Sequence, residues 1–288
     1  MKDSFTKPNH PLVGAIQRHV VAMNEGRNVG RDTEHLHASE MCKQDWCPRQ
    51  SLYRIRGTPE EGDQAPWWRL ANIFEEGHFI HEKYQTWLWD MGVLEGMWRC
   101  RACQHEWWAV SPGVCVRCFS SFIVYAEVPL ASEELMLVGH GDGIWNDAAE
   151  SGVRELVEIK SIGLRTIEIE APGFYKKYEE HEVDLIGLWK MIKRPFPQHL
   201  RQGMLYCRVT GINEIVFLYE FKANQDFKAF TVRYQPHLIE SRVQSALAVK
   251  TAVQSGGMVP RPSWAEDEDN STCKACPYRT TCWHLCPS

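Results

Sequence analysis

Apolar residues recur every three or four positions in several long stretches of the chain, which is the spacing of an amphipathic helix. The stretch after Pro197 has a proline suited to start a helix, and Gly211 is suited to end it. Ser39 is suited to cap a further helix, because its hydroxyl can accept a hydrogen bond from a free backbone N–H. The predicted helices cover residues 10–24, 66–92, 197–211 and 238–254.

Other stretches alternate apolar and polar residues, as half-buried strands do. Helices and strands interleave along the chain, which predicts an α/β protein with a mixed sheet flanked by helices. Residues 170–196 show no regular period and combine an exposed polar run with a basic one. The predicted strands cover residues 122–130, 135–145, 154–162, 214–222 and 227–234.

The stretch from Val138 to Ile162 is predicted to form two strands joined by a polar turn. Side chains two positions apart share a strand face, so His140 would lie with Asp142, and Glu158 with Lys160. If the strands pair as a hairpin, Asp142, Glu158 and Lys160 can converge on one spot. Two carboxylates and an ammonium there suit a hard divalent cation beside an anionic substrate. The alternative is an ordinary surface hairpin with a Glu–Lys pair.

The composition narrows the class of protein. With 288 residues, 44% hydrophobic and 24% charged, the chain can fold into one large domain or two modest ones. No apolar run is long enough to span a bilayer and the N-terminus lacks a signal-peptide core, so we expect an intracellular, cytoplasmic protein. A net charge of −5 excludes a globally basic nucleic-acid binder, so any DNA contact must come from a local basic surface.

Eleven cysteines in a reducing compartment indicate metal sites rather than disulfides. Cys100-x2-Cys103 and Cys115-x2-Cys118, with eleven residues between them, have the spacing of a zinc ribbon. Each Cys-x2-Cys turn aims two thiolates at one tetrahedral ion, and two turns complete its shell. A shell of four cysteines has no open position, which predicts a structural zinc that supplies folding energy to a short insert.

Further candidate ligands lie in the tail and on the helix over residues 66–92. Cys273-x2-Cys276-x5-Cys282 offers three thiolates and needs a fourth ligand from elsewhere. On the helix, His78 and His81 are three residues apart and share a face, which favours one of them pointing into a site.

Taken together, these residues resemble the RecB/AddB-like branch of the PD-(D/E)XK nucleases, which includes the RecB-like CRISPR-associated exonucleases. The resemblance runs from about Leu36 to Cys286 and rests on the order of six short motifs rather than on any one of them. It implies a restriction-endonuclease-like mixed sheet flanked by helices. The motifs are Cys47-Pro48-Arg49, Gly77-x3-His81, Gly139-x2-Asp142, Glu158-x-Lys160, Gln202-x3-Tyr206 and Cys273-x2-Cys276-x5-Cys282.

The resemblance implies a role for each matched residue. His81, Asp142 and Glu158, with the carbonyl of Ile159, would bind Mg²⁺ or Mn²⁺. Lys160 would position the attacking water or offset the charge that builds on the phosphate.

Other residues near these motifs are weaker candidates or contact the substrate. Gln202 and Tyr206 would lie beside the site and contact the DNA strand. His140 and His78 fall at positions that vary in the family, which favours His81 over both. Glu127 could supply a further carboxylate.

The same resemblance implies that four cysteines hold a 4Fe–4S cluster, which would staple the two ends of the fold together. Four thiolates suit zinc as well as iron–sulfur, and the family spacing favours iron–sulfur. Cys42 and Cys286 are nearby alternatives as ligands, and Cys207 is expected in the core. The implied cluster ligands are Cys47, Cys273, Cys276 and Cys282.

The zinc insert departs from the family pattern, because it lies between the histidine helix and the aspartate strand. Its residues Trp98, Trp107, Trp108 and Arg101 suit stacking on a single strand, and they suit a protein interface as well. The insert could therefore grip DNA, contact a partner or brace the domain.

The predicted function is metal-dependent hydrolysis of DNA phosphodiester bonds, as a single-strand exonuclease in DNA repair, recombination, or phage or CRISPR DNA processing. The chain lacks a Gly-x4-Gly-Lys-Ser/Thr motif, so unwinding would need a helicase or recombination partner. The alternatives are a non-catalytic DNA-binding recombination subunit with the same fold and a cysteine-rich electron-transfer protein. The predicted parts are an N-terminal helical part (1–95), a zinc-ribbon insert (96–120), a nuclease core (121–255) and a cluster-binding tail (256–288).

Overall fold

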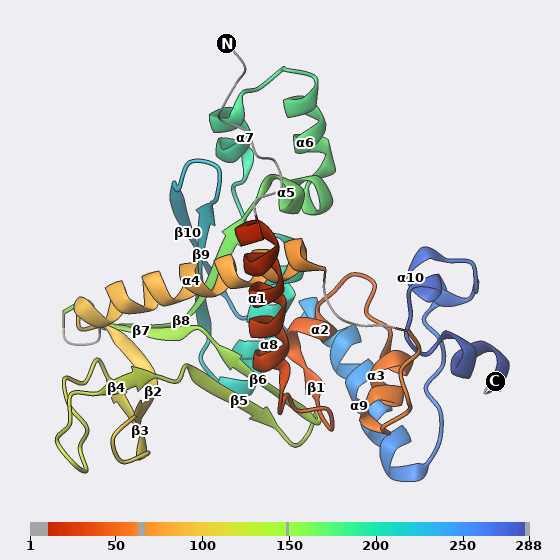
Figure 1. The fold of residues 1–288 in the computed structure, drawn as a ribbon, viewed down its shortest axis with the longest axis horizontal. Coiled ribbons are helices and arrows are strands. Elements are labelled where there is room, and N and C mark those ends of the chain that lie inside the picture. Colours follow the sequence, from red (N-terminus) through yellow and green to blue (C-terminus); the bar gives the residue numbers. More distant parts are fainter. Residues whose placement is uncertain (1–10, 63–66, 148–149, 286–288) are drawn as a thin grey trace.

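The computed structural model describes residues 11–62, 67–147 and 150–285, which form two sheets with helices around them (Figure 1). The main sheet has the strand order β10-β9-β8-β7-β2-β3, with β4 paired to β2, and the smaller sheet has the order β1-β6-β5. The strands are β1 (Leu36–His37), β2 (Leu94–Cys100), β3 (Glu106–Val110), β4 (Ile123–Tyr125), β5 (Val128–Ser132), β6 (Leu137–Gly141), β7 (Gly143–Asp147), β8 (Val153–Ile162), β9 (Glu214–Phe221) and β10 (Phe227–Arg233).

The helices precede, connect and follow these strands. Among the described residues, no helix combines the length and the apolar character needed to cross a membrane. The α-helices are α1 (Pro11–Asn28), α2 (Ala38–Met41), α3 (Pro48–Ile55), α4 (Trp68–Asp90), α5 (Leu164–Glu170), α6 (Pro172–Glu179), α7 (Leu185–Met191), α8 (Pro197–Thr210), α9 (Glu240–Ser255) and α10 (Ser271–Lys274). Short helical turns lie at Pro236–Leu238, Ser263–Ala265 and Thr281–Leu285.

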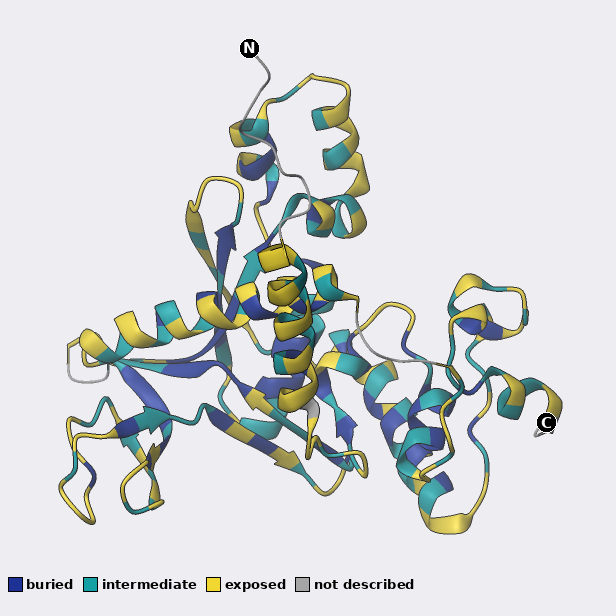
Figure 2. Cartoon of the chain, viewed as in Figure 1, coloured by how far each residue is buried: buried dark blue, intermediate teal, exposed yellow. Residues whose placement is uncertain are grey.

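Strand β8 lies at the centre of the core. It pairs antiparallel with β7 and parallel with β9, and the parallel pairing requires the long crossover that α5 to α8 supply. Alternate side chains point to opposite faces, so Val157 and Ile159 pack with Ile80 of α4, while Leu156 and Ile162 join the core beneath α8. Buried positions accordingly run along β8 and β9 in Figure 2. The sheet is thus covered by a helix on each face.

Helix α8 lies close to the sheet because of a glycine. It begins at Pro197 and is followed by Gly211 in the left-handed conformation, with φ of 74°, as the sequence predicts. A Cβ at Gly203 would clash with the Phe217 ring and with Ile215 on β9. Gly203 therefore permits the close approach that brings the inner face of α8 against the sheet.

The tail that follows α9 returns to the N-terminal part of the chain. The backbone N–H of Glu61 donates to the carbonyl of Pro277 at 2.8 Å. The Nε of buried Arg49, on α3, donates to the carbonyl of Val259 at 2.7 Å. Figure 1 shows α10 and the C-terminal end on the same side of the molecule as α3 and α9. Segments about two hundred residues apart are therefore joined by direct bonds.

The predicted α/β class, with a mixed sheet flanked by helices, is confirmed. The prediction for Ser39 is wrong, because α2 starts at Ala38 and Ser39 lies inside the helix. The stretch over residues 170–196, which has no regular period in sequence, contains α6 and α7.

Two predicted strands are each split in the structure. The strand over 122–130 breaks into β4 and β5 at Glu127, which has a left-handed φ of 63°. The strand over 135–145 breaks at Asp142, because β6 belongs to the smaller sheet and β7 to the main sheet. The prediction that His140 shares a strand face with Asp142 is therefore wrong, and His140 is exposed on β6.

We expect Gly203→Ala to lower the free energy of unfolding by about 1–3 kcal/mol, because the new methyl group must displace Phe217 or the helix. The matched control is Gly77→Ala in α4, where a Cβ would meet nothing within 4 Å. That change should stabilise by roughly 0.5–1 kcal/mol, since alanine is the better helix former. Urea denaturation of both variants measures the difference, and equal effects of the two substitutions would contradict the packing argument.

Candidate active site

Asp142 lies where the chain leaves the smaller sheet and enters the main one, and it joins three elements. Its Oδ2 accepts a hydrogen bond from the backbone N–H of Ile159 on β8 at 2.6 Å. Its Oδ1 lies 3.0 Å from Nδ1 of His81 on α4. The Asp142 side chain is only 10% exposed. A buried carboxylate is thereby held between a strand and a helix.

The two glycines that flank Asp142 let neighbouring groups approach it. A Cβ on Gly143 would come within 2.9 Å of Leu94 Cδ1. A Cβ on Gly141 would lie 3.7 Å from the ring of Tyr206, which is ordinary contact. The tight position is therefore Gly143, where a side chain would push β2 away from the start of β7.

Glu158 and Lys160 lie on one face of β8, and that face points toward α8. Lys160 Nζ is 2.5 Å from Glu158 Oε1. Glu158 is 1% exposed, and its second oxygen, Oε2, is buried without a hydrogen-bond partner among the described residues. A buried carboxylate oxygen with no partner is costly unless a proton or a cation compensates it. This oxygen is therefore suited to be a cation ligand.

The charges at this site set one another's protonation. Burial raises the pKa of Glu158 to about 7, against the opposing effect of Lys160. Burial also works against ionisation of Asp142, but His81 and Lys160 outweigh it and lower the pKa of that carboxyl. Burial opposes the charged forms of Lys160 and His81, and the carboxylates outweigh it and raise both pKa values. A cation at the site would meet one ionised carboxylate and a second that ionises near neutral pH.

Helix α8 covers the same face of β8 with two polar side chains. Gln202 Nε2 donates to the hydroxyl of Tyr206 at 2.6 Å, and both residues are buried. Burial raises the pKa of Tyr206 well above its ordinary value, and the nearby charges of Glu158 and Asp142 add to the rise. The tyrosine is therefore a neutral hydrogen-bonding group beside the two carboxylates.

The alternative cation ligands that the sequence offers, His140, His78 and Glu127, lie at different places relative to this site. Exposed His140 lies outside it, whereas His78 and Glu127 line a cavity together with His81. Burial and the charge of Asp142 raise the pKa of Glu127 to about 7. Glu127 thus remains close enough to act as an additional carboxylate.

Sequence reasoning missed Gln85, which lies on the same cavity. Its Nε2 donates to the backbone carbonyl of Asp142 at 2.9 Å, so α4 holds the junction at two points. Gln85 follows His81 by four residues and therefore shares its helix face, which is the signal that could have found it.

His81, Asp142 and Glu158 do not close on a single point. Among the described residues, the ligand atoms of these three are not all within 4.8 Å of one another. Instead, Glu158 Oε1 is paired with Lys160, and Asp142 Oδ1 is paired with the imidazole of His81. Binding of a cation by all three side chains would require these side chains to exchange partners.

The four cysteines of the insert, by contrast, form a closed cluster. The sulfurs of Cys100, Cys103, Cys115 and Cys118 all lie within 4.8 Å of one another. Cys100 is 3.5 Å from Cys118, and Cys103 is 3.7 Å from Cys115. A tetrahedral ion with Zn–S bonds of about 2.3 Å spaces its sulfurs by roughly 3.8 Å. The ribbon of β2, β3 and β4, with its two cysteine turns, therefore fits a single tetrahedral metal ion.

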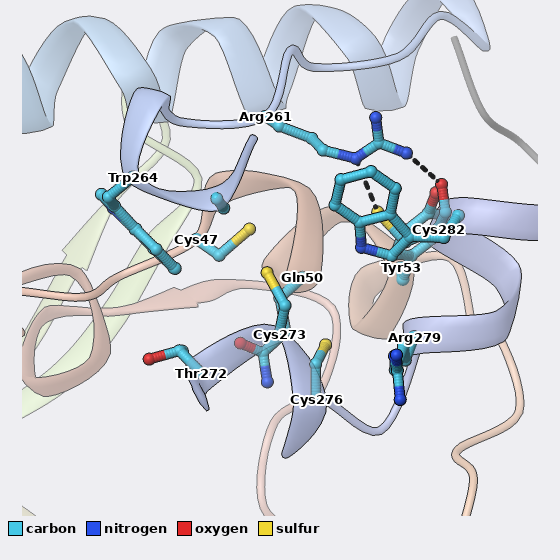
Figure 3. Close-up of a pocket in the computed structure, with 12 residues that line it drawn as sticks. Cys47, Gln50, Tyr53, Arg261, Trp264, Thr272, Cys273, Cys276, Arg279 and Cys282 are labelled. Atoms are coloured by element: carbon cyan, nitrogen blue, oxygen red, sulfur yellow. Dashed lines mark hydrogen bonds between the residues drawn. The ribbon is translucent and has the colours of Figure 1, made fainter. Parts of the chain in front are cut away.

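The sulfurs of the four tail cysteines are not gathered together as those of the ribbon are. Cys47, Cys273, Cys276 and Cys282 line one pocket (Figure 3), but their sulfurs do not all lie within 4.8 Å of one another. Nε of Arg261 lies 3.4 Å from the sulfur of Cys282 and stabilises negative charge there. Thiolates spread around a cavity suit a multi-iron cluster better than one ion.

The remaining cysteines behave differently from one another. Cys207 is buried in the main core, as predicted. Cys42 is fully buried in the same core and does not line the tail cavity, so the prediction that it lies near the cluster is wrong. Cys286 lies outside the described residues.

Comparison with known proteins gives only distant similarities. No family model matches the chain, and no curated protein matches it. The crystal structure of SSO0001 is similar at 10% identity, with 93% of this chain and 96% of that chain covered and a TM-score of 0.44. An alkaline exonuclease from Laribacter hongkongensis, LHK-Exo, is similar at 10% identity over 83% of this chain and 93% of that chain, with a TM-score of 0.42. Its complex with dAMP gives a TM-score of 0.40. TM-scores this low do not establish a common fold, so function is inferred from the site itself.

Proposed function

We propose that the protein is a Mg²⁺- or Mn²⁺-dependent deoxyribonuclease that hydrolyses phosphodiester bonds, acting as an exonuclease on single-stranded DNA. The observation that carries the proposal is a set of three contacts: His81 of α4 pairs with Asp142, Lys160 pairs with Glu158, and Asp142 accepts a hydrogen bond from the backbone of Ile159, which lies between Glu158 and Lys160 on β8. The order of sequence motifs, which resembles that of the RecB/AddB-like PD-(D/E)XK nucleases, supports it independently.

The donor set fits a hard divalent cation. His81, Asp142 and Glu158 supply one imidazole and two carboxylates, and the carbonyl of Ile159 is the fourth proposed ligand. The partnerless Oε2 of Glu158 is the oxygen most in need of a cation. When bound, Mg²⁺ or Mn²⁺ polarises the scissile phosphate and activates a water molecule for attack.

The remaining side chains act on the substrate directly. Lys160, which is paired with Glu158, would orient the attacking water and offset negative charge on the phosphate. Gln202 and Tyr206, which hydrogen-bond to each other beside the carboxylates, contact the strand from α8.

We further propose that the ribbon holds a structural zinc ion and that Cys47, Cys273, Cys276 and Cys282 hold a 4Fe–4S cluster. The close sulfurs of the ribbon support one ion, whereas the wider tail cavity supports the larger cluster. The cluster would reinforce the direct bonds between α3 and the tail.

The nuclease proposal is tested with labelled single- and double-stranded DNA and Mn²⁺. We expect the wild-type protein to degrade single strands and Lys160→Ala to lose roughly 100- to 1000-fold in rate, since it removes a group that stabilises developing charge. The matched control is Lys250→Ala on α9, whose ammonium bonds to the carbonyl of Glu133.

The control should retain full activity. Equal cleavage by wild type and Lys160→Ala would contradict the assignment of the site. Binding of DNA without any cleavage by the wild-type protein would instead favour a non-catalytic DNA-binding subunit.

The zinc and iron contents of the purified protein and of one variant at each cysteine site test the two metal assignments. Anaerobically prepared protein should contain about one zinc and about four iron atoms per chain and absorb visible light. Cys103→Ser should lose the zinc and keep the iron, whereas Cys276→Ser should lose the iron and the brown colour and keep the zinc. Each variant is the control for the other. Two zinc ions per chain without visible absorption would contradict the iron–sulfur assignment.

A further inference from the structure

One cavity lies between the ribbon and the face of α4 that carries His81, which is the one proposed cation ligand that lines it. It has a volume of about 360 Å³ and is lined by residues of both α4 and the ribbon. His81 and Gln85 of α4, with Glu127, form the wall at the active site. Arg101 and Tyr125 line the cavity from the ribbon side. A substrate bound at His81 therefore has the ribbon as a second wall.

The ribbon is fixed to this wall by its tryptophans. Strand β2 belongs to the main sheet through its pairing with β7 and to the ribbon through its pairing with β3 and β4. Trp98 is fully buried, and its ring lies 5.0 Å from those of both Trp89 on α4 and Tyr125 on β4. Trp108, although partly exposed, donates its Nε1 hydrogen to Glu95. Trp98 therefore braces the ribbon and has no exposed face for a substrate, while the bond to Glu95 fixes the ring of Trp108.

Arg101 and Phe122 are the side chains that remain available. The backbone N–H of Arg101 donates to the carbonyl of Phe122 at 2.8 Å, and the guanidinium lies 5.9 Å from the phenyl ring. Phe122 is 61% exposed and Arg101 is exposed. No described carboxylate forms an ion pair with Arg101, whereas the neighbouring Arg99 is paired with Glu106. A guanidinium that lines the cavity therefore lies beside an exposed ring, although the ring of Phe122 does not itself line the cavity.

This combination fits one kind of occupant. A single DNA strand offers a phosphate for a guanidinium and an unpaired base for an aromatic face, and both contacts are independent of sequence. The protein carries a net charge of −5, so a local cation is needed to attract a polyanion to a cleft that also holds acidic residues. A base-paired duplex would keep its bases stacked on one another and unavailable to Phe122.

We propose that the zinc ribbon is the substrate-gripping wall of the nuclease cleft, with Arg101 holding a phosphate and Phe122 stacking on a base of the single strand that enters the active site. That the strand runs from the ribbon into the active site rests on the proposed nuclease function. The DNA-binding role of the insert is a separate assignment. The metal then has a clear purpose, because it holds β2 and β4, and with them Arg101 and Phe122, in one geometry.

The test measures the affinity for a fluorescein-labelled single strand by anisotropy, with Ca²⁺ in place of Mg²⁺ so that the strand is not cut. We expect Arg101→Ala and Phe122→Ala each to weaken binding about 10-fold, the loss that one phosphate or one stacking contact carries. The matched controls are Arg117→Ala and Phe119→Ala. Both residues are exposed on the same ribbon. Arg117 does not line the cavity that Arg101 lines, and the Arg101 guanidinium lies over the ring of Phe122 rather than that of Phe119.

The controls should change the affinity less than about twofold. Zinc content of every variant verifies that the ribbon is folded. Equal losses for Arg101→Ala and Arg117→Ala would overturn the proposal in favour of diffuse charge attraction. Unchanged binding by Arg101→Ala and Phe122→Ala would also overturn it and leave the ribbon surface to a protein partner.

A separate assay distinguishes failure of the nuclease proposal from failure of the ribbon proposal. The wild-type protein is tested with Mn²⁺ on bis(p-nitrophenyl) phosphate, a diester too small to span the cavity. If it hydrolyses neither this diester nor DNA, but Arg101→Ala still weakens strand binding, the nuclease proposal fails and the ribbon proposal stands. If it hydrolyses both and the ribbon variants bind normally, the ribbon proposal alone fails.

Discussion

A buried carboxylate must be compensated by groups that its own strand does not provide, and Asp142 obtains this compensation from β8 and α4. One Asp142 oxygen accepts a hydrogen bond from the backbone N–H of Ile159, and the other faces the His81 imidazole. Gln85 donates a hydrogen bond to the backbone carbonyl of Asp142. Leaving a buried charge without its partner typically costs about 3–5 kcal/mol, so these contacts fix the relative positions of the helix, the sheet and the strand junction. The junction that separates the two sheets therefore also builds the site.

Two groups of cysteines lie in segments outside the main core: one in the ribbon of β2, β3 and β4, and one in the tail after α9 together with Cys47. The ribbon continues β2 beyond the main sheet and has only a small apolar cluster of its own, around Leu94 and Trp98. The tail has short helical turns and reaches the core mainly through α3. Neither segment buries much apolar surface, so cross-linking by a metal centre is an effective source of stability for both. The sulfurs of the ribbon are gathered within 4.8 Å of one another, whereas those of the tail are not.

Much of this arrangement could be read from local sequence signals. Pro197 and Gly211 bound α8 because each has a backbone preference that depends on few neighbours. The Glu158–Lys160 pair follows from strand alternation, and the cysteine pairs of the ribbon follow from turn geometry. Asp142 was predicted to lie within one strand with His140, yet the chain changes sheets there, and only tertiary packing decides such a change. Ser39 failed as a cap for a related reason, since its hydroxyl was judged without the preceding backbone conformation at His37.

The central claim is that His81, Asp142 and Glu158 bind a divalent cation beside Lys160. Anomalous diffraction from crystals grown with Mn²⁺ tests it most directly, because the ion reports its own position. We expect a manganese peak bonded to Asp142 and Glu158, with Lys160 displaced from the Glu158 carboxylate. A structure in which manganese is absent from this pocket, with Glu158 still paired to Lys160, would contradict it.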